Sequence, residues 1–201
     1  MLAQGKPIRK GLGEEEIQQI KEKIYGRIVE YGDGEDFPAE ANPDFGIANV
    51  EDLVYTIVNP IITAFKRTTR QKSFSTKKAI TALGSNASSY LHPVKTNIIG
   101  LESQEFIVLV ETMSESLGEA MLLCMLTMKD LAEDNSIFVV CGFVTTGEFW
   151  EMVRFDGRVF TPTETLQVLF STMAQDKESR LKEAAIVVDC LHLALRSGGL
   201  Q

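Results

Sequence analysis

Apolar residues recur every three or four positions in three segments, and each of these segments predicts an amphipathic helix. The segments are residues 14–32, 50–70 and 177–197. Three glutamates open the first segment and suit the positive end of a helix dipole, and Gly32 is a suitable stop. The second segment follows Asn49, which is expected as its N-cap, and Pro60 is expected to kink or split it.

A central stretch of the chain predicts two strands and a helix. The strands are expected at Val94–Leu101 and Glu105–Thr112, with a polar turn between them. The second strand contains the continuous apolar run FIVLV, which is typical of a strand covered on both faces. The helix that follows, Leu117–Leu131, is apolar around most of its circumference, so we expect it to be buried between layers.

The last third of the chain predicts an antiparallel meander followed by helices. Residues 136–162 contain three short strand patterns, with breaks at Thr146-Gly147 and Asp156-Gly157. A short helix is then expected over 165–175, capped by Thr163 or Thr165. We divide the chain into a flexible tail (1–12), an N-terminal helix with an acidic loop (13–48) and a single α/β domain (49–201).

The composition excludes several classes of protein. Hydrophobic residues make up 44% of the 201 positions and charged residues 24%, as in an ordinary globular domain. A net charge of -8 argues against a protein that coats nucleic acid with its whole surface. Cys124, Cys141 and Cys190 lie in separate apolar runs and predict buried thiols rather than a zinc site. His192, beside an apolar stripe, is expected as an ordinary, partly buried histidine.

No signal peptide is evident, and helix 117–131 is too short to span a bilayer. We therefore expect a soluble, intracellular protein, cytoplasmic or nuclear, with no membrane partner.

A basic cluster interrupts this acidic chain between the second helix and the central strands. It consists of Lys66, Arg67, Arg70, Lys72, Lys77 and Lys78. One interpretation is a face that contacts the phosphates of a nucleic acid. The other is a solvated helix end and loop, because aromatic residues within the cluster are limited to Phe74.

The two central strands carry the strongest candidate for chemistry. The sequence contains no phosphate-binding GxxxxGK[ST] loop and no GxSxG nucleophile motif. Residues two apart in a strand share a face, so pairing of these faces would bring Lys95, Asn97 and Glu111 together near the strand ends. Such a cluster is able to hold magnesium, which activates water and stabilises charge on a phosphodiester.

The order of elements resembles the PD-(D/E)XK nuclease-like superfamily. It runs helix, strand, turn, strand ending in E-x-x, helix, and a strand that reads VVCGFVTTGEFWEMVRFDG. The chain looks most similar to the fungal and oomycete forms found in Crinkler-type effectors and spore-killer proteins. A Gly-x-x-Thr-x-Gly-x-x-Trp segment commonly follows the core helix in these forms. In this chain it falls on Gly142, Thr145, Gly147 and Trp150.

The resemblance covers roughly residues 49–196 and implies a restriction-endonuclease-like α/β fold. That fold has a central mixed sheet, one buried core helix and flanking N- and C-terminal helices. The family's metal-binding aspartate falls on Asn97, its glutamate on Glu111 and its lysine on Met113. The downstream glutamine of the helix would fall near Glu119, and the glutamate of the N-terminal helix on Glu51.

One of the three core positions is kept, so the resemblance implies a degenerate site. We therefore expect an effector or regulatory module that binds DNA or a host or partner protein. The first alternative is an active Mg- or Mn-dependent DNA endonuclease, with the metal on Glu111 and Asn97 and a migrated lysine, Lys95 or Lys129. The second is an α/β scaffold that docks a basic partner protein.

Overall fold

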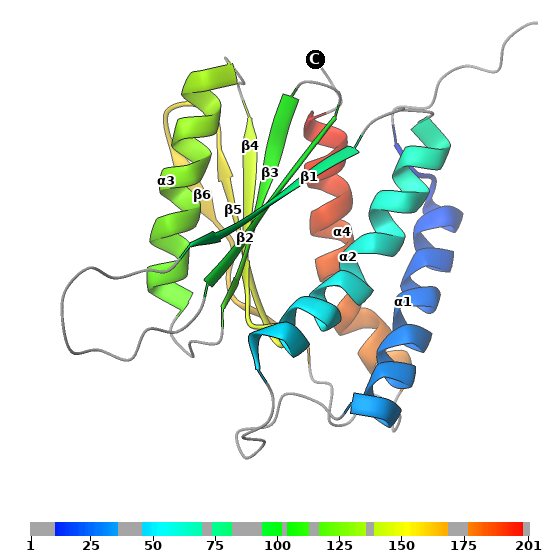
Figure 1. Cartoon of the computed structure of the whole chain (residues 1–201). Coiled ribbons are helices and arrows are strands. Elements are labelled where there is room, and N and C mark those ends of the chain that lie inside the picture. Colours follow the sequence, from blue (N-terminus) through cyan, green and yellow to red (C-terminus); the bar gives the residue numbers. More distant parts are fainter. Residues whose placement is uncertain are drawn as a thin grey trace, which may run out of the picture.

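In the described part of the chain, seven strands form one mixed sheet in the computed structural model, and helices cover both faces (Figure 1). The described residues are 11–35, 46–69, 74–81, 94–101, 104–112, 117–135, 139–168 and 177–198. The strands are β1 (Phe74–Thr81), β2 (Val94–Leu101), β3 (Gln104–Thr112), β4 (Val140–Thr145), β5 (Phe149–Phe155), β6 (Phe160–Pro162) and β7 (Leu166–Gln167). The helices are α1 (Glu14–Glu35), α2 (Ile47–Thr69), α3 (Leu117–Asn135) and α4 (Lys177–Gly198).

The strands lie in the order β1 to β6 across the sheet, and β7 pairs with β5. Strands β1, β2 and β3 are antiparallel neighbours. Helix α3 then carries the chain back, so β4 runs parallel to β3. Strands β4, β5 and β6 form the antiparallel meander that the sequence predicts, with Gly147 and Gly157 at positive φ in its two turns. The α/β class and the mixed sheet are thus confirmed.

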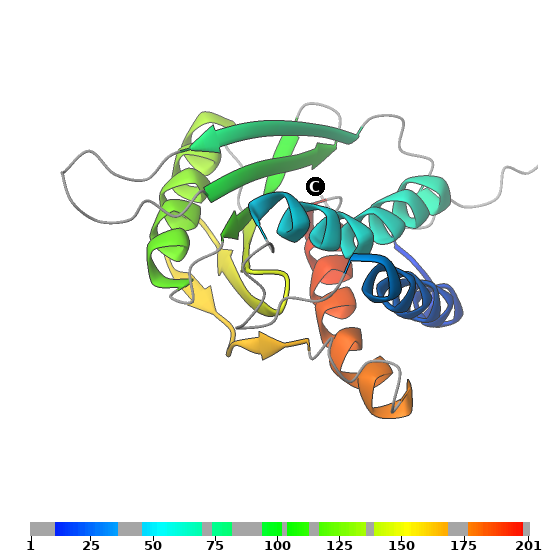
Figure 2. The same cartoon turned by 60° about the horizontal axis from the view of Figure 1, so that its bottom comes forward.

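The two faces of the sheet pack against different helices. Val108 and Val110 of β3 belong to a core shared with α3, whereas Ile107 and Leu109 belong to a core shared with α1, α2 and α4. Figures 1 and 2 show α3 alone on one side and the other three helices on the opposite side. Strand β3 is therefore buried on both faces, as its continuous apolar run predicts.

Two helix starts use the same local device. Gly13 and Gly46 stand just before α1 and α2, and their backbone N–H groups donate to the side chains of Glu16 (2.9 Å) and Asn49 (2.9 Å). This is the backward bond of a capping box, so Asn49 lies inside the first turn and is not the N-cap predicted. The prediction of Gly32 as a stop is also wrong, because α1 continues through it.

Helix α2 bends but does not split at Pro60. It runs unbroken from Ile47 to Thr69 with Pro60 inside it, and its two halves point in different directions (Figure 2). Proline has no N–H for the carbonyl one turn earlier, which accounts for the bend. No helix in the described ranges is long and apolar enough to cross a membrane.

Two strands occupy segments that were predicted otherwise. Strand β1 lies in the basic segment, for which the sequence predicts no strand. It is a polar strand at the edge of the sheet, and such strands lack the apolar alternation by which strands are recognised. Strand β7 replaces the start of the helix expected over 165–175, and 169–175 lie outside the described residues.

Helix α3 covers one face of the sheet rather than lying between two layers. Its inner face is buried through Leu117, Ala120, Cys124, Met128 and Leu131. On its outer face Leu122 is 61% exposed and Leu126 is 54% exposed. The prediction of a helix buried all round is therefore wrong for the described part of the chain.

Gly142 sets how closely α3 approaches the sheet. A Cβ at this position of β4 would lie 2.5 Å from Cys124 Sγ and 2.9 Å from Val153 Cγ1, and still closer to Met128 Sδ. Real Cβ atoms do not approach other atoms so closely. The sulfur side chains of α3 therefore rest directly on the backbone of β4.

We predict that Gly142→Ala destabilises the fold by ~1–3 kcal/mol, because it overpacks the contact between α3 and β4. Urea unfolding followed by circular dichroism measures this loss. Gly26→Ala on α1 is the matched control, since a Cβ there meets nothing within 4 Å. It should leave stability unchanged or raise it by ~0.5–1 kcal/mol. Equal effects of the two variants would contradict the packing argument.

Candidate functional site

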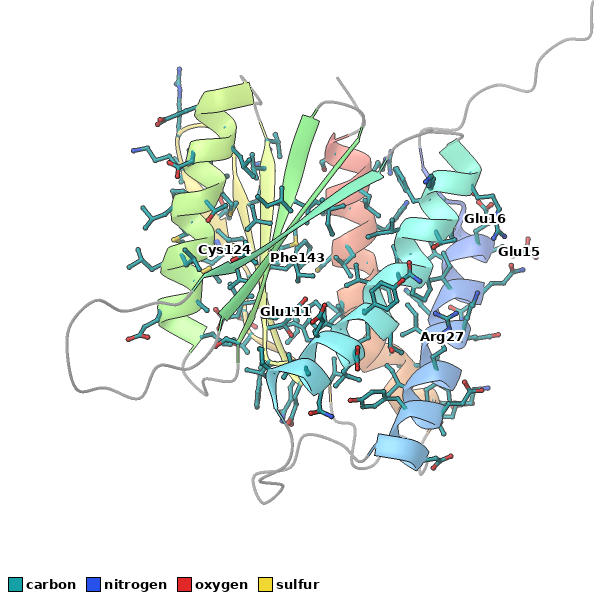
Figure 3. All side chains as sticks on the ribbon, viewed as in Figure 1. Glu15, Glu16, Arg27, Glu111, Cys124 and Phe143 are labelled. Atoms are coloured by element: carbon teal, nitrogen blue, oxygen red, sulfur yellow. The ribbon has the colours of Figure 1, made fainter. Side chains whose placement is uncertain are left out.

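Glu111, the acidic residue that the resemblance assigns to a catalytic site, lies near the end of β3. Its side chain is only 2% exposed. It follows Ile107 and Leu109 on the face of β3 that packs against α2 and α4, and Figure 3 shows it between the sheet and α2. Glu111 is thus buried between the sheet and the helices of the α1, α2 and α4 layer, on the opposite side of the sheet from α3.

The backbone register places the other two candidates on the same face of the sheet as Glu111. Lys95 is the direct partner of Glu111 across the antiparallel β2–β3 pair, and Asn97 is the partner of Leu109. Directly opposed residues of such a pair share a face. The sequence prediction that these strand faces come together is therefore confirmed at the level of register. The residue nearest Glu111 across β2 is the lysine, and Asn97 is one diagonal step away.

On its other side Glu111 pairs with Thr145 of β4, which is fully buried. Thr145 Oγ1 accepts the backbone N–H of Gly147 (2.8 Å), and the indole N–H of Trp150 donates to the Gly147 carbonyl (2.7 Å). Trp150 is itself the register partner of Thr145 and is buried. A row of register partners thus crosses four strands, from Lys95 through Glu111 and Thr145 to Trp150. It ends in a turn that is held by two hydrogen bonds to the Gly147 backbone.

This turn gives a structural account of the four-residue segment on which the resemblance partly rests. Gly142 lets α3 approach the sheet, and Gly147 has φ of 90°, a conformation that favours glycine. Thr145 and Trp150 hydrogen-bond the backbone of Gly147. Each residue type is thus explained by packing or turn geometry, without any catalytic role.

The remaining positions taken from the resemblance do not gather around Glu111. Glu119 and Lys129 are exposed on α3, which covers the opposite face, so Lys129 is not a migrated lysine for this site. Glu51 is half-buried in the first turns of α2. Met113 lies outside the described residues.

The described residues around Glu111 do not fit a magnesium or manganese centre. Magnesium sites in proteins use one or two carboxylates with water and require near-octahedral geometry. Within the described ranges, no three His, Cys, Asp or Glu side chains lie close enough together to hold a metal. The register neighbours of Glu111 are a lysine and a threonine rather than a second carboxylate.

The basic cluster divides between two elements. Lys66 and Arg67 are exposed in the last turn of α2, and Lys77 and Lys78 are successive residues of β1. Successive strand residues belong to opposite faces of a sheet, so Lys77 and Lys78 do not share one surface. Arg70 and Lys72 lie outside the described residues.

Arg67 instead joins two cations of α1 in a groove that the sequence did not predict. The groove lies between α1 and α2, has a volume of about 370 Å³ and is lined by Lys23, Arg27 and Arg67. Glu16 also lines it, but its two oxygens accept hydrogen bonds from Thr68 Oγ1 (3.1 Å) and the Gly13 N–H (2.9 Å). Figure 3 shows Arg27 and Glu16 along this side of α1.

The signal for this groove is present in the sequence but is not readable without the fold. Lys23 and Arg27 stand four residues apart and so share one face of a helix. These two residues line the same groove as Arg67 only because α1 and α2 pack side by side. No sequence pattern specifies that packing.

Cys124, Cys141 and His192 behave as packing residues, as predicted, whereas Cys190 is only partly buried. Burial raises the pKa of the Cys124 thiol to about 12 and that of Cys141 to about 11, so neither is a reactive thiolate at neutral pH. His192 is half-buried on α4, 6.3 Å edge-on from the ring of Phe65. Its Nε2 accepts the backbone N–H of Leu12 (3.2 Å) and ties the chain before α1 to α4.

Compared with protein-family models, curated proteins and solved structures, the chain matches none of them.

We predict that the protein loses stability as the pH falls below about 6.5, in part through His192. Burial, with a smaller contribution from Arg196, holds the pKa of His192 below its ordinary value of 6.5. The unfolded chain therefore takes up the proton first, and stability falls below pH 6.5 until the folded state also titrates. Chemical unfolding at several pH values should show a weaker dependence in His192→Gln. An unchanged dependence in that variant would contradict the assignment.

Proposed function

We propose that this chain is a PD-(D/E)XK nuclease-like domain that has lost its cutting site and works as a binding module. The order α2, β1, β2, β3, α3, β4, in which β1 is a strand that the sequence did not predict, supports the restriction-endonuclease-like fold that the resemblance implies, with β3 and β4 parallel around the crossover helix. The resemblance rests on this order and on the Gly-x-x-Thr-x-Gly-x-x-Trp segment.

The position of Glu111 is the observation that carries the loss of cutting. A metal-dependent nuclease needs carboxylates that share a cation with water and the substrate phosphate. Glu111 is 2% exposed, and its direct register neighbours are Lys95 and Thr145. Neither neighbour is a second carboxylate, so the register leaves Glu111 without the acidic partner with which it would share a cation.

The groove between α1 and α2 is the proposed binding surface, and nucleic acid is the partner it favours. Lys23, Arg27 and Arg67 converge there from two helices in a chain whose net charge is -8. A local concentration of cations in an acidic protein is a device for selecting phosphates at one place and repelling them elsewhere. Asn59 and Thr63 add hydrogen-bonding groups to the same lining.

A second candidate is an active DNA endonuclease that uses Glu111 with Lys95. The direct pairing of these two positions across β2 and β3 favours it, because a lysine beside the carboxylate is what the family's chemistry requires. Both candidates share the fold. They differ in whether magnesium or manganese binds at Glu111 and supports cleavage of DNA.

We predict that the protein does not cleave DNA in magnesium or manganese, and that neither ion raises its melting temperature. Incubation with supercoiled and linear DNA, together with thermal unfolding with and without each ion, measures both. Glu111→Gln is the matched variant, because it keeps the shape of the side chain and removes the charge. Cleavage by the natural chain that disappears in Glu111→Gln would overturn the proposal and establish the endonuclease.

We predict that short duplex DNA binds at low salt through the groove. The triple variant Lys23→Gln/Arg27→Gln/Arg67→Gln should bind at least ~10-fold more weakly, and its salt dependence should fall by about one unit of slope per lost phosphate contact. Fluorescence anisotropy at several salt concentrations measures both quantities. The control is Arg154→Gln/Arg158→Gln/Lys182→Gln, which removes three exposed cations from other surfaces.

Equal loss in both triple variants would exclude the groove as the DNA-binding face. If the natural chain shows no DNA binding even at low salt, the partner of the module is a protein.

A further inference from the structure

The outer face of α3 carries an ordered stripe of side chains that neither the fold nor the proposed function uses. The stripe consists of Glu119, Leu122, Leu126, Lys129 and Glu133. Its spacing alternates between three and four residues, which is the spacing of a coiled-coil seam. Leu122 and Leu126, more than half exposed, stand at its centre. An exposed apolar pair in a helical seam is typical of a helix that packs against a second helix.

The charges on either side of the leucines show what kind of helix fits. Glu119 lies three residues before Leu122, and Lys129 lies three residues after Leu126. The four residues from Glu119 to Lys129 are therefore symmetric in spacing about their centre and opposite in charge at their two ends. A copy of the same helix, turned end for end, places the lysine of each against the glutamate of the other.

We propose that two copies of this chain associate through the outer faces of their α3 helices. The two helices run antiparallel, and the two-fold axis passes midway between Leu122 and Leu126. Leu122 of each copy packs against Leu126 of the other, and Glu119 of each pairs with Lys129 of the other. All four contacts arise in two identical pairs, as an isologous interface requires. The parallel arrangement brings glutamate to glutamate and lysine to lysine, so repulsion selects against it.

The apolar contact extends beyond the two leucines. Met121 and Met125 are partly buried beside the stripe and pack on the core under α3. Methionine side chains adapt readily to a partner surface. Lys129 Nζ already lies 3.8 Å from Glu133 Oε1 in the same helix, so the added partner joins an existing ion pair.

Helix α4 also exposes two aliphatic residues but does not have this symmetry. On α4, Ile186 is 47% exposed and Leu193 is 55% exposed. The residues beyond them at helical spacing, Lys182 and Arg196, are both cationic, so an antiparallel copy brings like charges together. Of these two helices, α3 is thus the one whose outer face complements itself.

The seam is short, and the dimer it forms is weak. The helical overlap runs from residue 117 to 131 in each copy, about 22 Å at a rise of ~1.5 Å per residue. Such a contact is smaller than the interface of a permanent dimer, so the monomer and the dimer exchange with protein concentration. Sedimentation equilibrium over a wide range of concentrations measures this exchange.

The natural chain should show a reversible monomer–dimer equilibrium, and Leu122→Gln/Leu126→Gln should remain monomeric while keeping the natural circular dichroism spectrum. Leu193→Gln is the matched control, because it removes an equally exposed leucine from α4. It should dimerise like the natural chain. Dimerisation that survives the double variant would place the interface elsewhere and overturn the proposal.

A charge exchange tests the antiparallel geometry separately from the apolar contact. Glu119→Lys and Lys129→Glu should each weaken the dimer roughly tenfold, because two ion pairs become two repulsions. The combined variant Glu119→Lys/Lys129→Glu should restore the natural dissociation constant. Single variants that dimerise normally would exclude the antiparallel pairing. A natural chain that stays monomeric at every concentration would overturn the proposal as a whole.

Discussion

The burial of the middle strands on both faces is the constraint on which the rest of the structure depends. Strands β3 and β4 run parallel, which requires a crossover helix, and α3 supplies it on one face while α2 and α4 close the other. A strand covered on both faces has no room for a large side chain wherever a helix comes close. Gly142 meets this requirement, and Cys124 and Met128 fill the space above it. The fold is therefore sensitive at β4 and tolerant on the outer surfaces of its helices.

The same constraint decides what Glu111 is able to do. Alternation along β3 assigns it to the inner face with Leu109, where α2 covers the sheet. The turn of Thr145, Gly147 and Trp150 lies beside it and is held by buried hydrogen bonds. The segment on which the nuclease resemblance partly rests thus supplies the residues that form this turn. Turn geometry and packing account for its residue pattern, which therefore carries no information about a reaction.

Sequence reasoning recovered the elements whose residue pattern records their burial. The run FIVLV predicted β3 because both faces are apolar, and the glycines at 147 and 157 predicted the two turns of the meander. It failed where burial depends on distant parts of the chain. Strand β1 is polar because it lies at an edge, and the outer leucines of α3 look like core residues in the sequence alone. In the site, the shared face of Lys95 and Glu111 followed from alternation. Their direct opposition depends on the register of the β2–β3 pair, which no residue pattern specifies.

The two surfaces inferred here lie on opposite sides of the sheet, and this arrangement relates them. The groove belongs to α1 and α2, whereas the symmetric stripe belongs to α3 on the other face (Figure 2). Two copies joined through α3, as we propose, carry their grooves on the side of each copy away from the shared interface. Neither groove is covered in such a dimer, so pairing through α3 and phosphate binding in the groove do not compete. Each of the two proposals is therefore tested by variants that leave the surface of the other unchanged.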